Sequence, residues 1–479
     1  MAIDTTVEPL IETVLHLRAD ADPPGADFGA LPEGVAGALR GICAADVCEL
    51  SLTESVLAAD GPGGLLRLQV LLRRLDAGGQ LERGIRVSGR LLARLRPVGR
   101  GRVPRTVTLP PAQPVKLSRF AAVRAEGGRL IAQAPRACTE VELAPEAGGL
   151  LGALAGWTTP GDVAGAVASP CLPAGAVGAI LPLFADAGLL APGGPDADLE
   201  CDAPAQAQWT LPDLWLHARS RGPRLGASYG GAYPMAARFP PLPSRAEPDP
   251  GPCLQLPVPD PGAVAKADLT LHEALEGRRS IREHDDAAPL TVEQLGELLH
   301  RTTRLRNTFI AADGQEAADR PYPSGGAAHE LEIYPLVTSC AGLEPGLWHY
   351  RADEHQLRLI AKAEPVVLRM AASARESCLM ASDPQVVLVI AARFGRVMWK
   401  YDAIAYSLVL KHVGVYMQTV YLVATAMGLA VCGVGGGDAG DFAAATGLDY
   451  YAQGSVGEMV VGSRPANPGD AMRLPAPGG

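Results

Sequence analysis

The chain has 479 residues, too many for one ordinary hydrophobic core, and this length predicts two or three domains. Hydrophobic residues form 48% of it, and the formal net charge of −10 argues against a general nucleic-acid binder, which needs basic surface to displace counterions from phosphates. The nine cysteines include no C-x-x-C pair, and acids stand near the N-terminus where a signal peptide needs positive charge, so we expect a cytoplasmic protein with reduced thiols.

Two stretches of the N-terminal half share one pattern, a leucine-spaced helix that ends in Asp-Ala-Gly. The first occupies 65–79 and the second 180–188, and in each a glycine can adopt the left-handed conformation that ends a helix. A β-like alternation is predicted at 47–52. Helix, glycine stop and β-like sequence are typical of small winged-helix domains. We therefore predict two winged-helix-like modules, 1–110 and 111–200; a coincidental repeat of a common capping phrase is the alternative.

The rest of the chain predicts an α+β fold with a central sheet flanked by helices, over residues 263–479. It follows a linker or wrapping segment, 201–262, which ends in a proline-dense run that can sustain neither a helix nor a central strand. The stretch 413–432 is about as long and apolar as a membrane span, but Gln418 and its glycines favour a buried helix, so no membrane association is expected. Three helices are predicted, at 271–276, at 403–427 and starting at Thr291, where Thr291 and Gln294 form a capping box. Three strands are predicted, at 331–337, 386–392 and 455–462.

The sharpest chemical signal is the sequence Arg-Arg-Ser-Ile-Arg at 278–282, directly after a short amphipathic helix. Three guanidiniums and a hydroxyl within five residues can form charge-assisted, forked hydrogen bonds to a phosphate. The alternative is a solvated basic turn, because cations are favoured at a helix C-terminus.

Three further segments follow in a characteristic order. Pro323-Ser324-Gly325-Gly326 precedes a strand, the adjacent Lys400 and Tyr401 precede the long helix, and the glycine-rich run 432–437 follows that helix. Glycines that follow a helix exclude a Rossmann or P-loop site, in which they open the helix onto phosphate. Together with the arginine motif, these segments resemble the nitroreductase superfamily, and within it the SagB-type thiazole/oxazole dehydrogenases. The resemblance covers about 210–465.

This resemblance implies an FMN cofactor and an intertwined homodimer with the flavin at its interface. Lys400 and Tyr401 correspond to the catalytic signature of that branch, and the long helix would form the dimer core. The implied cofactor-binding residues are Arg278, Arg279, Ser280, Arg282, Pro323, Ser324, Gly325, Gly326, Gln418, Gly433, Gly435, Gly436 and Arg464. A plain terminal arginine is the alternative at Arg464, and a flexible surface loop is the alternative for the glycine run.

The resemblance implies an azoline dehydrogenase, which oxidises thiazoline or oxazoline rings of a ribosomal precursor peptide to thiazole or oxazole. The ring Cα proton lies beside an imine and an amide carbonyl, so a modest base can remove it while hydride leaves to flavin N5. Lys400 would be this base if burial and nearby guanidiniums lower its pKa, and Tyr401 would orient substrate or relay the proton. The rivals are an NAD(P)H-dependent nitroreductase or flavin reductase, and a non-catalytic peptide-binding scaffold.

The N-terminal half offers a partner hypothesis. Relatives with such extensions use winged-helix-like modules to hold a precursor peptide beside a heterocycle-forming synthetase (cyclodehydratase), and a ridge of arginines would steer an acidic leader peptide. A solvated basic face is the alternative. Leu117-Ser118-Arg119-Phe120 and 216–221 also resemble the N-terminal extension of this branch, and no metal-ligand spacing occurs. The arginines in question are Arg83, Arg86, Arg90, Arg94, Arg96, Arg100, Arg102 and Arg105.

Overall fold

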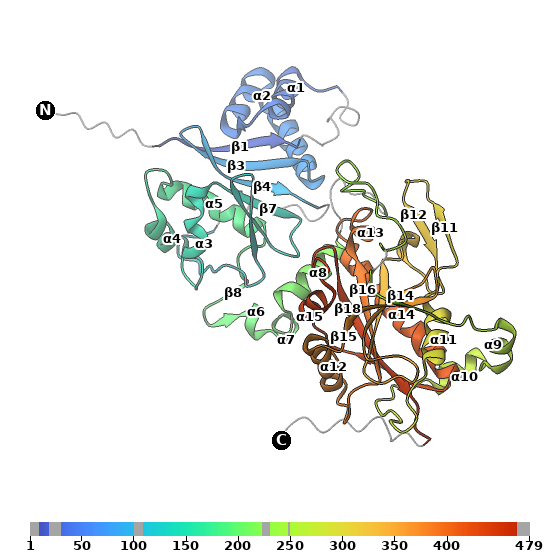
Figure 1. Ribbon diagram of the computed structural model, residues 1–479. Coiled ribbons are helices and arrows are strands. Elements are labelled where there is room, and N and C mark those ends of the chain that lie inside the picture. The colour runs from blue at the N-terminus through green and yellow to red at the C-terminus, as the bar shows by residue number, and fades with distance from the viewer. Residues whose placement is uncertain (1–8, 19–29, 100–108, 223–229, 248–249, 467–479) are drawn as a thin grey trace. The chain divides into compact units, whose positions relative to one another are not determined.

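The computed structural model describes residues 9–18, 30–99, 109–222, 230–247 and 250–466. These residues belong to two compact units, Met1–Ser228 and Tyr229–Gly479 (Figure 1). Each unit is a seven-stranded sheet with helices packed on it, so the α+β fold class is confirmed. Among the helices in the described ranges, none has both the length and the apolar character that a membrane crossing requires.

The N-terminal unit is built on an antiparallel sheet with strand order β2-β1-β3-β4-β7-β6-β5. One apolar core lies between β1 and helices α1 and α2, and a second lies between the β4–β7 region and α5. The strands are β1 (Ile11–Leu17), β2 (Val47–Cys48), β3 (Leu81–Val87), β4 (Arg90–Pro97), β5 (Ala122–Glu126), β6 (Arg129–Gln133) and β7 (Thr139–Leu143). The main helices are α1 (Glu33–Ala44), α2 (Glu49–Ala77), α3 (Gly149–Ala153), α4 (Pro160–Val167), α5 (Ala174–Asp186), α6 (Leu199–Asp202), α7 (Pro204–Ala207) and α8 (Leu211–Arg221).

The predicted strand at 47–52 is wrong beyond its first two residues, because α2 already begins at Glu49. An acidic side chain in the first turn interacts favourably with the helix dipole, and Leu52 and Val56 bury one face of the helix at a spacing of four residues. The glycine stops are confirmed. Gly79 and Gly188 have φ values of +67° and +63°, the left-handed conformation expected after each helix.

The arginine ridge is wrong for the five arginines that the structure describes, because each of them pairs with an acid of its own unit. Register explains this: Arg86 stands opposite Glu12 on the neighbouring strand and its Nε lies 2.9 Å from the carboxylate. Cross-strand pairs of opposite charge stabilise a sheet and leave little charge for a partner. Arg100, Arg102 and Arg105 lie outside the described residues. The other pairs are Arg83–Asp76, Arg90–Glu146, Arg94–Asp46, Arg94–Glu82, Arg96–Glu82, Arg96–Glu140 and Arg96–Glu142.

The C-terminal unit is an antiparallel sheet with strand order β10-β15-β14-β13-β16-β18-β17. All eight residues of the inner strand β16 are buried. Val386, Leu388 and Ile390 face the core formed with α11 and α14, whereas the alternate residues face α12 and α15, so helices cover both faces of the sheet (Figure 1). The strands are β10 (Cys253–Gln255), β13 (Leu331–Val337), β14 (Gly346–Arg351), β15 (Gln356–Lys362), β16 (Val386–Arg393), β17 (Leu429–Val434) and β18 (Gln453–Ser463).

The helices of this unit agree with the sequence pattern where capping and periodicity were strong. Thr291 caps α11 and exchanges hydrogen bonds with Gln294 as the predicted capping box. The stretch 413–432 is helix only as far as Ala426 and then turns at Gly428 into β17. The helices are α9 (Pro261–Ala267), α10 (Leu271–Gly277), α11 (Val292–Thr303), α12 (Pro365–Cys378), α13 (Phe394–Met398), α14 (Ala405–Ala426) and α15 (Ala439–Thr446), and a hairpin is formed by β11 (Asn307–Ile310) and β12 (Glu316–Asp319).

Candidate active site

The arginine motif lies beside strand β17, where it forms one cluster with the end of helix α14. The backbone N–H of Ile281 donates to the carbonyl of Val431 at 2.9 Å and anchors the motif. Ser280 Oγ lies 3.0 Å from the hydroxyl of Tyr421, and the guanidinium of Arg278 lies 5.4 Å from the centre of the Tyr421 ring. The backbone N–H of Gly433 donates to the same hydroxyl at 2.7 Å. We call Arg278, Ser280, Arg282, Tyr421 and Gly433 the arginine cluster.

The charge of Arg282 affects the buried thiol of Cys432, which is paired with the thiol of Cys378. The pKa of Cys432 is lowered to about 6; the hydrogen bond with the thiol of Cys378 is the main cause, burial opposes it, and the charge of Arg282 adds to the lowering. The pKa of Cys378 is raised by the same hydrogen bond and by burial. The hydrogen bond between the two thiols thus favours the thiolate at Cys432 over that at Cys378.

Two members of the predicted cofactor set do different work in the structure. Arg279 is exposed and donates from its guanidinium to the carbonyls of Glu276 and Arg278 at 2.7 and 2.8 Å, so it caps the end of α10. Gly433 lies in β17 and not in a loop, and its N–H is engaged by Tyr421, so it is not an exposed donor as expected. Pro323, Gln418, Gly435, Gly436 and Arg464 are exposed side chains or exposed backbone.

The second cluster joins the segment 323–327 to the adjacent Lys400 and Tyr401. Gly326 has a φ of +61°, and a Cβ atom added there would lie 2.6 Å from the Tyr401 hydroxyl and 3.0 Å from Lys400 Nζ. Only glycine fits such a close approach in this conformation. The structure therefore brings together two segments that are more than seventy positions apart in the chain.

Lys400 is paired with an acid that the sequence reasoning did not identify. Its Nζ lies 2.8 Å from Asp313 Oδ2, and the hydroxyl of Tyr233 donates to the same oxygen at 2.9 Å. The backbone N–H groups of Ala232 and Tyr233 donate to the Lys400 carbonyl at 2.8 and 3.0 Å. Burial lowers the pKa of Lys400, but the hydrogen bond and the charge of Asp313 outweigh it, so the pKa is raised. The expected lowering is therefore wrong for this arrangement. Asp313 belongs to an Asp-Gly turn, which sequence alone assigns to the hairpin.

A buried histidine holds the glycine segment from the other side. His412 Nδ1 lies 2.7 Å from Glu330 Oε1, and His412 Nε2 accepts a hydrogen bond of 2.7 Å from the backbone N–H of Gly325. The side chain of Glu330 is fully buried. In the sequence, the position of His412 on the buried face of a long helix is the one indication of the His412–Glu330 pair. Lys400, Tyr401, Gly326, His412 and Asp313 are hereafter the lysine cluster.

Helix α14 carries parts of both clusters. His412 and Tyr421 are nine positions apart, which corresponds to roughly 14 Å along the helix at 1.5 Å per residue. Within one chain, the arginine cluster and the lysine cluster therefore contact α14 at two different places along its length.

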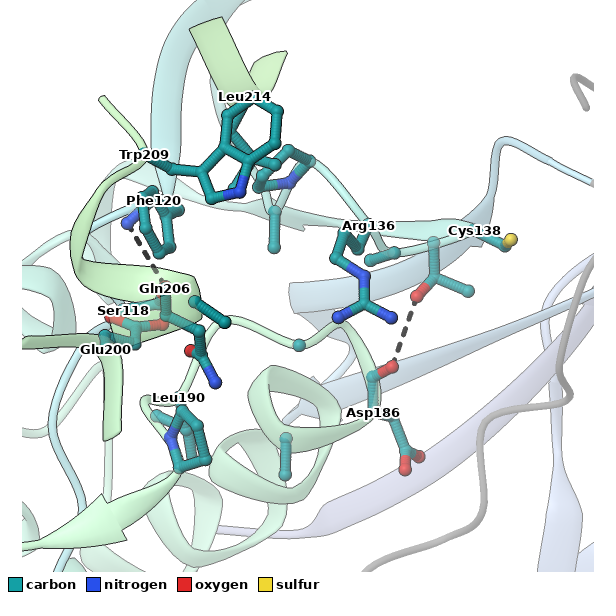
Figure 2. Close-up of a pocket in the computed structure, with 18 residues that line it drawn as sticks. Ser118, Phe120, Arg136, Cys138, Asp186, Leu190, Glu200, Gln206, Trp209 and Leu214 are labelled. Atoms are coloured by element: carbon teal, nitrogen blue, oxygen red, sulfur yellow. Dashed lines mark hydrogen bonds between the residues drawn. The ribbon is translucent and has the colours of Figure 1, made fainter. Parts of the chain in front are cut away.

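A cavity with a volume of about 980 Å³ lies in the N-terminal unit. Figure 2 shows Arg136, Trp209, Ser118 and Glu200 among the residues that line it. The buried carboxylate of Glu200 accepts hydrogen bonds from Ser118 Oγ at 2.5 Å and from the backbone N–H of Arg119 at 2.8 Å. The Leu117–Phe120 segment, noted in the sequence for its resemblance, therefore forms part of this wall.

Known proteins resemble both units. A model of the nitroreductase family matches residues 275–463, and a model of the cyanobactin oxidase ThcOx matches residues 115–225. A protein of Methanocaldococcus jannaschii that is named as a nitroreductase is 34% identical over 170 residues, which are 35% of this chain and 79% of that protein.

Two solved structures are similar at lower identity. A protein of Ralstonia eutropha described as a nitroreductase is 20% identical, with a TM-score of 0.36, and the match covers 48% of this chain and 97% of that one. A chain of the Escherichia coli microcin synthetase McbBCD complex with truncated pro-MccB17 bound is 17% identical, with a TM-score of 0.33, and the match covers 50% and 88%. Because the archaeal relative is 34% identical and is matched over 79% of its length, the chain belongs to the nitroreductase family.

Proposed function

We propose that this nitroreductase-family oxidoreductase uses FMN to oxidise thiazoline or oxazoline rings of a ribosomal precursor peptide to thiazole or oxazole. The observation that carries the proposal is the contact of Gly326 with the adjacent Lys400 and Tyr401. This lysine–tyrosine pair resembles the catalytic signature of azoline dehydrogenases, and the match of residues 115–225 to a cyanobactin oxidase supports a peptide substrate.

The arginine cluster fits the phosphate end of FMN. Arg278, Ser280 and Arg282 supply two guanidiniums and a hydroxyl, donors that suit phosphate oxygens. When bound, FMN would supply the hydride acceptor for the oxidation.

The lysine cluster provides the proton chemistry. Lys400 is held as an ammonium by Asp313, so its proton must leave before the amine can take the Cα proton of an azoline. Asp313, 2.8 Å away, is not the acceptor, because burial is outweighed by its hydrogen bonds with Lys400, Gln315 and Tyr233, which lower its own pKa, so the proton leaves to solvent. Tyr401, whose hydroxyl lies at the same glycine, would orient the ring. The contacts of Tyr233 cover this pair, so a substrate must displace the tyrosine or enter beside it.

A homodimer is part of the proposal, because α14 presents apolar side chains to solvent. Tyr406, Leu410 and Val415 are 40%, 40% and 36% exposed, and Leu271 of α10 is 68% exposed. Exposed apolar groups of this size are typical of a protein–protein interface. A second chain packed on α14 would bury them and would add its own arginine and lysine clusters.

The N-terminal unit is proposed to hold the precursor peptide, with a cyclodehydratase as a further partner. Its cavity is lined by Trp209, which is 37% exposed, and by the exposed Arg136 (Figure 2). Aromatic and arginine side chains are enriched in peptide-binding surfaces. The described arginines between 83 and 96 are engaged in internal pairs, so this cavity is the better candidate within the unit.

The proposal is tested on the purified full-length chain with an azoline-containing peptide. We expect a yellow protein that removes two hydrogen atoms per ring, measured by mass spectrometry. Lys400→Ala should remain folded and yellow but fail to oxidise the rings, and normal turnover by this variant would contradict the assigned role. A rival nitroreductase or flavin reductase activity would instead show as rapid bleaching of the flavin by NADPH.

Cofactor binding is tested separately with a matched pair of variants. Arg278→Ala combined with Arg282→Ala should yield colourless protein, because both guanidiniums of the arginine cluster are lost. Arg279→Ala should stay yellow, since this guanidinium caps α10. Flavin absorbance per chain is the measurement, and equal flavin content in both variants would refute the assignment.

A further inference from the structure

The segment that faces Lys400 and Tyr401 is held in a conformation that L-amino acids avoid. Gly326, Ala327 and His329 have φ values of +61°, +52° and +44°. Two of these residues are not glycine, and a side chain in the left-handed region crowds its own backbone. Such strained positions persist only where surrounding contacts enforce them, and they concentrate at functional sites.

Buried side chains enforce this conformation. The backbone N–H of His329 donates to Ser324 Oγ at 3.0 Å, and the fully buried guanidinium of Arg396 donates from Nε to the carbonyl of Ala328 at 2.6 Å. The third contact is the hydrogen bond of 2.7 Å from Gly325 N–H to His412 Nε2. It is the contact closest in sequence to Gly326, and it connects the segment to helix α14.

The hydrogen bonds determine which nitrogen of His412 carries the proton. A backbone N–H can only donate, so Nε2 must present its lone pair to Gly325. Nδ1 therefore carries the hydrogen and donates to the buried Glu330 carboxylate, 2.7 Å away. A carboxylate that accepts from one ring nitrogen fixes the tautomer and the orientation of the ring. Because Nε2 is already occupied, His412 is not available as the base for the oxidation.

We propose that Glu330 and His412 are positioning residues: the carboxylate holds His412 in the Nδ1–H tautomer, and Nε2 then holds Gly325 so that the strained backbone of Gly326 lies against Lys400 and Tyr401. The effect on oxidation rests on the proposed function, whereas the hydrogen-bond arrangement does not. Losing the Gly325 contact lets the segment relax and moves Gly326 away from the reactive pair. Misplacement by about 1 Å can lower a rate roughly hundredfold.

The test uses two variants of the full chain, each of which replaces one of the two ring nitrogens of His412 with a side-chain amide. In His412→Gln, the side-chain oxygen can take the place of Nε2 and accept from Gly325. In His412→Asn, the amide can replace Nδ1 and reach Glu330, but nothing accepts from Gly325. Hydrogen–deuterium exchange of the peptide spanning 324–329 should stay slow in His412→Gln and become at least roughly tenfold faster in His412→Asn. With an azoline peptide, kcat should fall roughly tenfold to hundredfold in His412→Asn at similar KM, and His412→Gln should recover most of it.

A control and a second measurement keep the outcomes distinct. His349→Asn breaks another buried histidine–glutamate contact, 3.4 Å to Glu332, and should leave exchange at 324–329 unchanged. If His412→Asn does not fold, the ¹⁵N spectrum of histidine-labelled wild type decides, since the resonances absent from His412→Gln must report an Nδ1–H tautomer. Slow exchange in both His412 variants, or an Nε2–H tautomer, overturns the inference. Wild type without azoline activity but with the expected exchange pattern would refute the proposed function and leave the positioning role intact.

Discussion

Replacing Gly326 by alanine is the sharpest perturbation of the lysine cluster. The new methyl group would lie 2.6 Å from the Tyr401 hydroxyl, 3.0 Å from Lys400 Nζ and 3.2 Å from Lys400 Cε. Real Cβ atoms do not approach other heavy atoms to 2.6 Å, so one of the partners must move. All three atoms are far ends of flexible side chains, and we therefore expect Lys400 and Tyr401 to shift while the backbone stays in place.

The size of the effect follows from the backbone strain of the new side chain and from its clash with Tyr401 and Lys400. An L-residue in the left-handed conformation costs about 1–2 kcal/mol, and the clash is largely relieved by side-chain movement. The free energy of unfolding should therefore fall by about 1–2 kcal/mol, or roughly 2–8 °C in Tm for a unit of this size. The displaced catalytic pair should lower kcat by about two orders of magnitude, because rates depend steeply on the alignment of reacting groups.

A second glycine separates the effect of backbone strain from the effect of displacing Lys400 and Tyr401. Gly428, at the end of α14, has a φ of +66°, and a Cβ atom there meets nothing within 4 Å. Gly428→Ala should thus lose similar stability but keep its activity. Both variants are compared by thermal unfolding and by oxidation of an azoline peptide. If Gly326→Ala turns over as fast as Gly428→Ala, the contact between Gly326 and the lysine–tyrosine pair has no role in catalysis.

Three further predictions concern charge and assembly. Asp313→Asn removes the charge that raises the Lys400 pKa, so the pH dependence of kcat/KM should shift to lower pH if Lys400 is the base; an unchanged profile would exclude that role. Burial raises the pKa of Glu458 to about 7 from 4.5, so its contribution to stability is full below 4.5 and is lost as the pH rises through 7. At a pH of about 8, the free energy of unfolding of Glu458→Gln, measured by denaturant titration, should therefore exceed that of wild type by up to roughly 3 kcal/mol. At a pH of about 4 the two should differ little, and an equal gain in stability at both pH values would contradict this. Leu410→Glu on the exposed side of α14 should yield a monomer by light scattering, whereas Leu368→Glu on α12, which is 49% exposed, should not; a dimeric Leu410→Glu protein would exclude α14 as the interface.

The elements predicted well were those whose signals are local. Strand β13 has the predicted bounds, and β16 and β18 lie within two residues of theirs. The capping box of Thr291 and the left-handed glycines are equally local, since each depends on contacts within four residues. Resemblance added the order of the motifs, and with it the family, which the archaeal relative confirms.

The corrections to the charged groups involve partners distant in the chain. An arginine-rich stretch reveals that charge is present, but strand register decides that Arg86 faces Glu12 and not solvent. The raised pKa of Lys400 depends on Asp313, which reaches it from a hairpin turn eighty-seven positions earlier. Periodicity reports which side of an element is buried and carries no information about the group it meets.

The sequence by itself determined three helices and three strands of the C-terminal unit and the glycine stops, because capping, periodicity and steric freedom act over a few residues. Only the tertiary structure decided the partners that give the predicted site residues their properties. Gly325 and His412 are 87 positions apart, and Ser280 and Tyr421 are 141 apart. Hydrogen bonds over such separations form only after the sheet has set its register and α14 has packed on it, so the tautomer of His412 and the charge of Lys400 are properties of the fold.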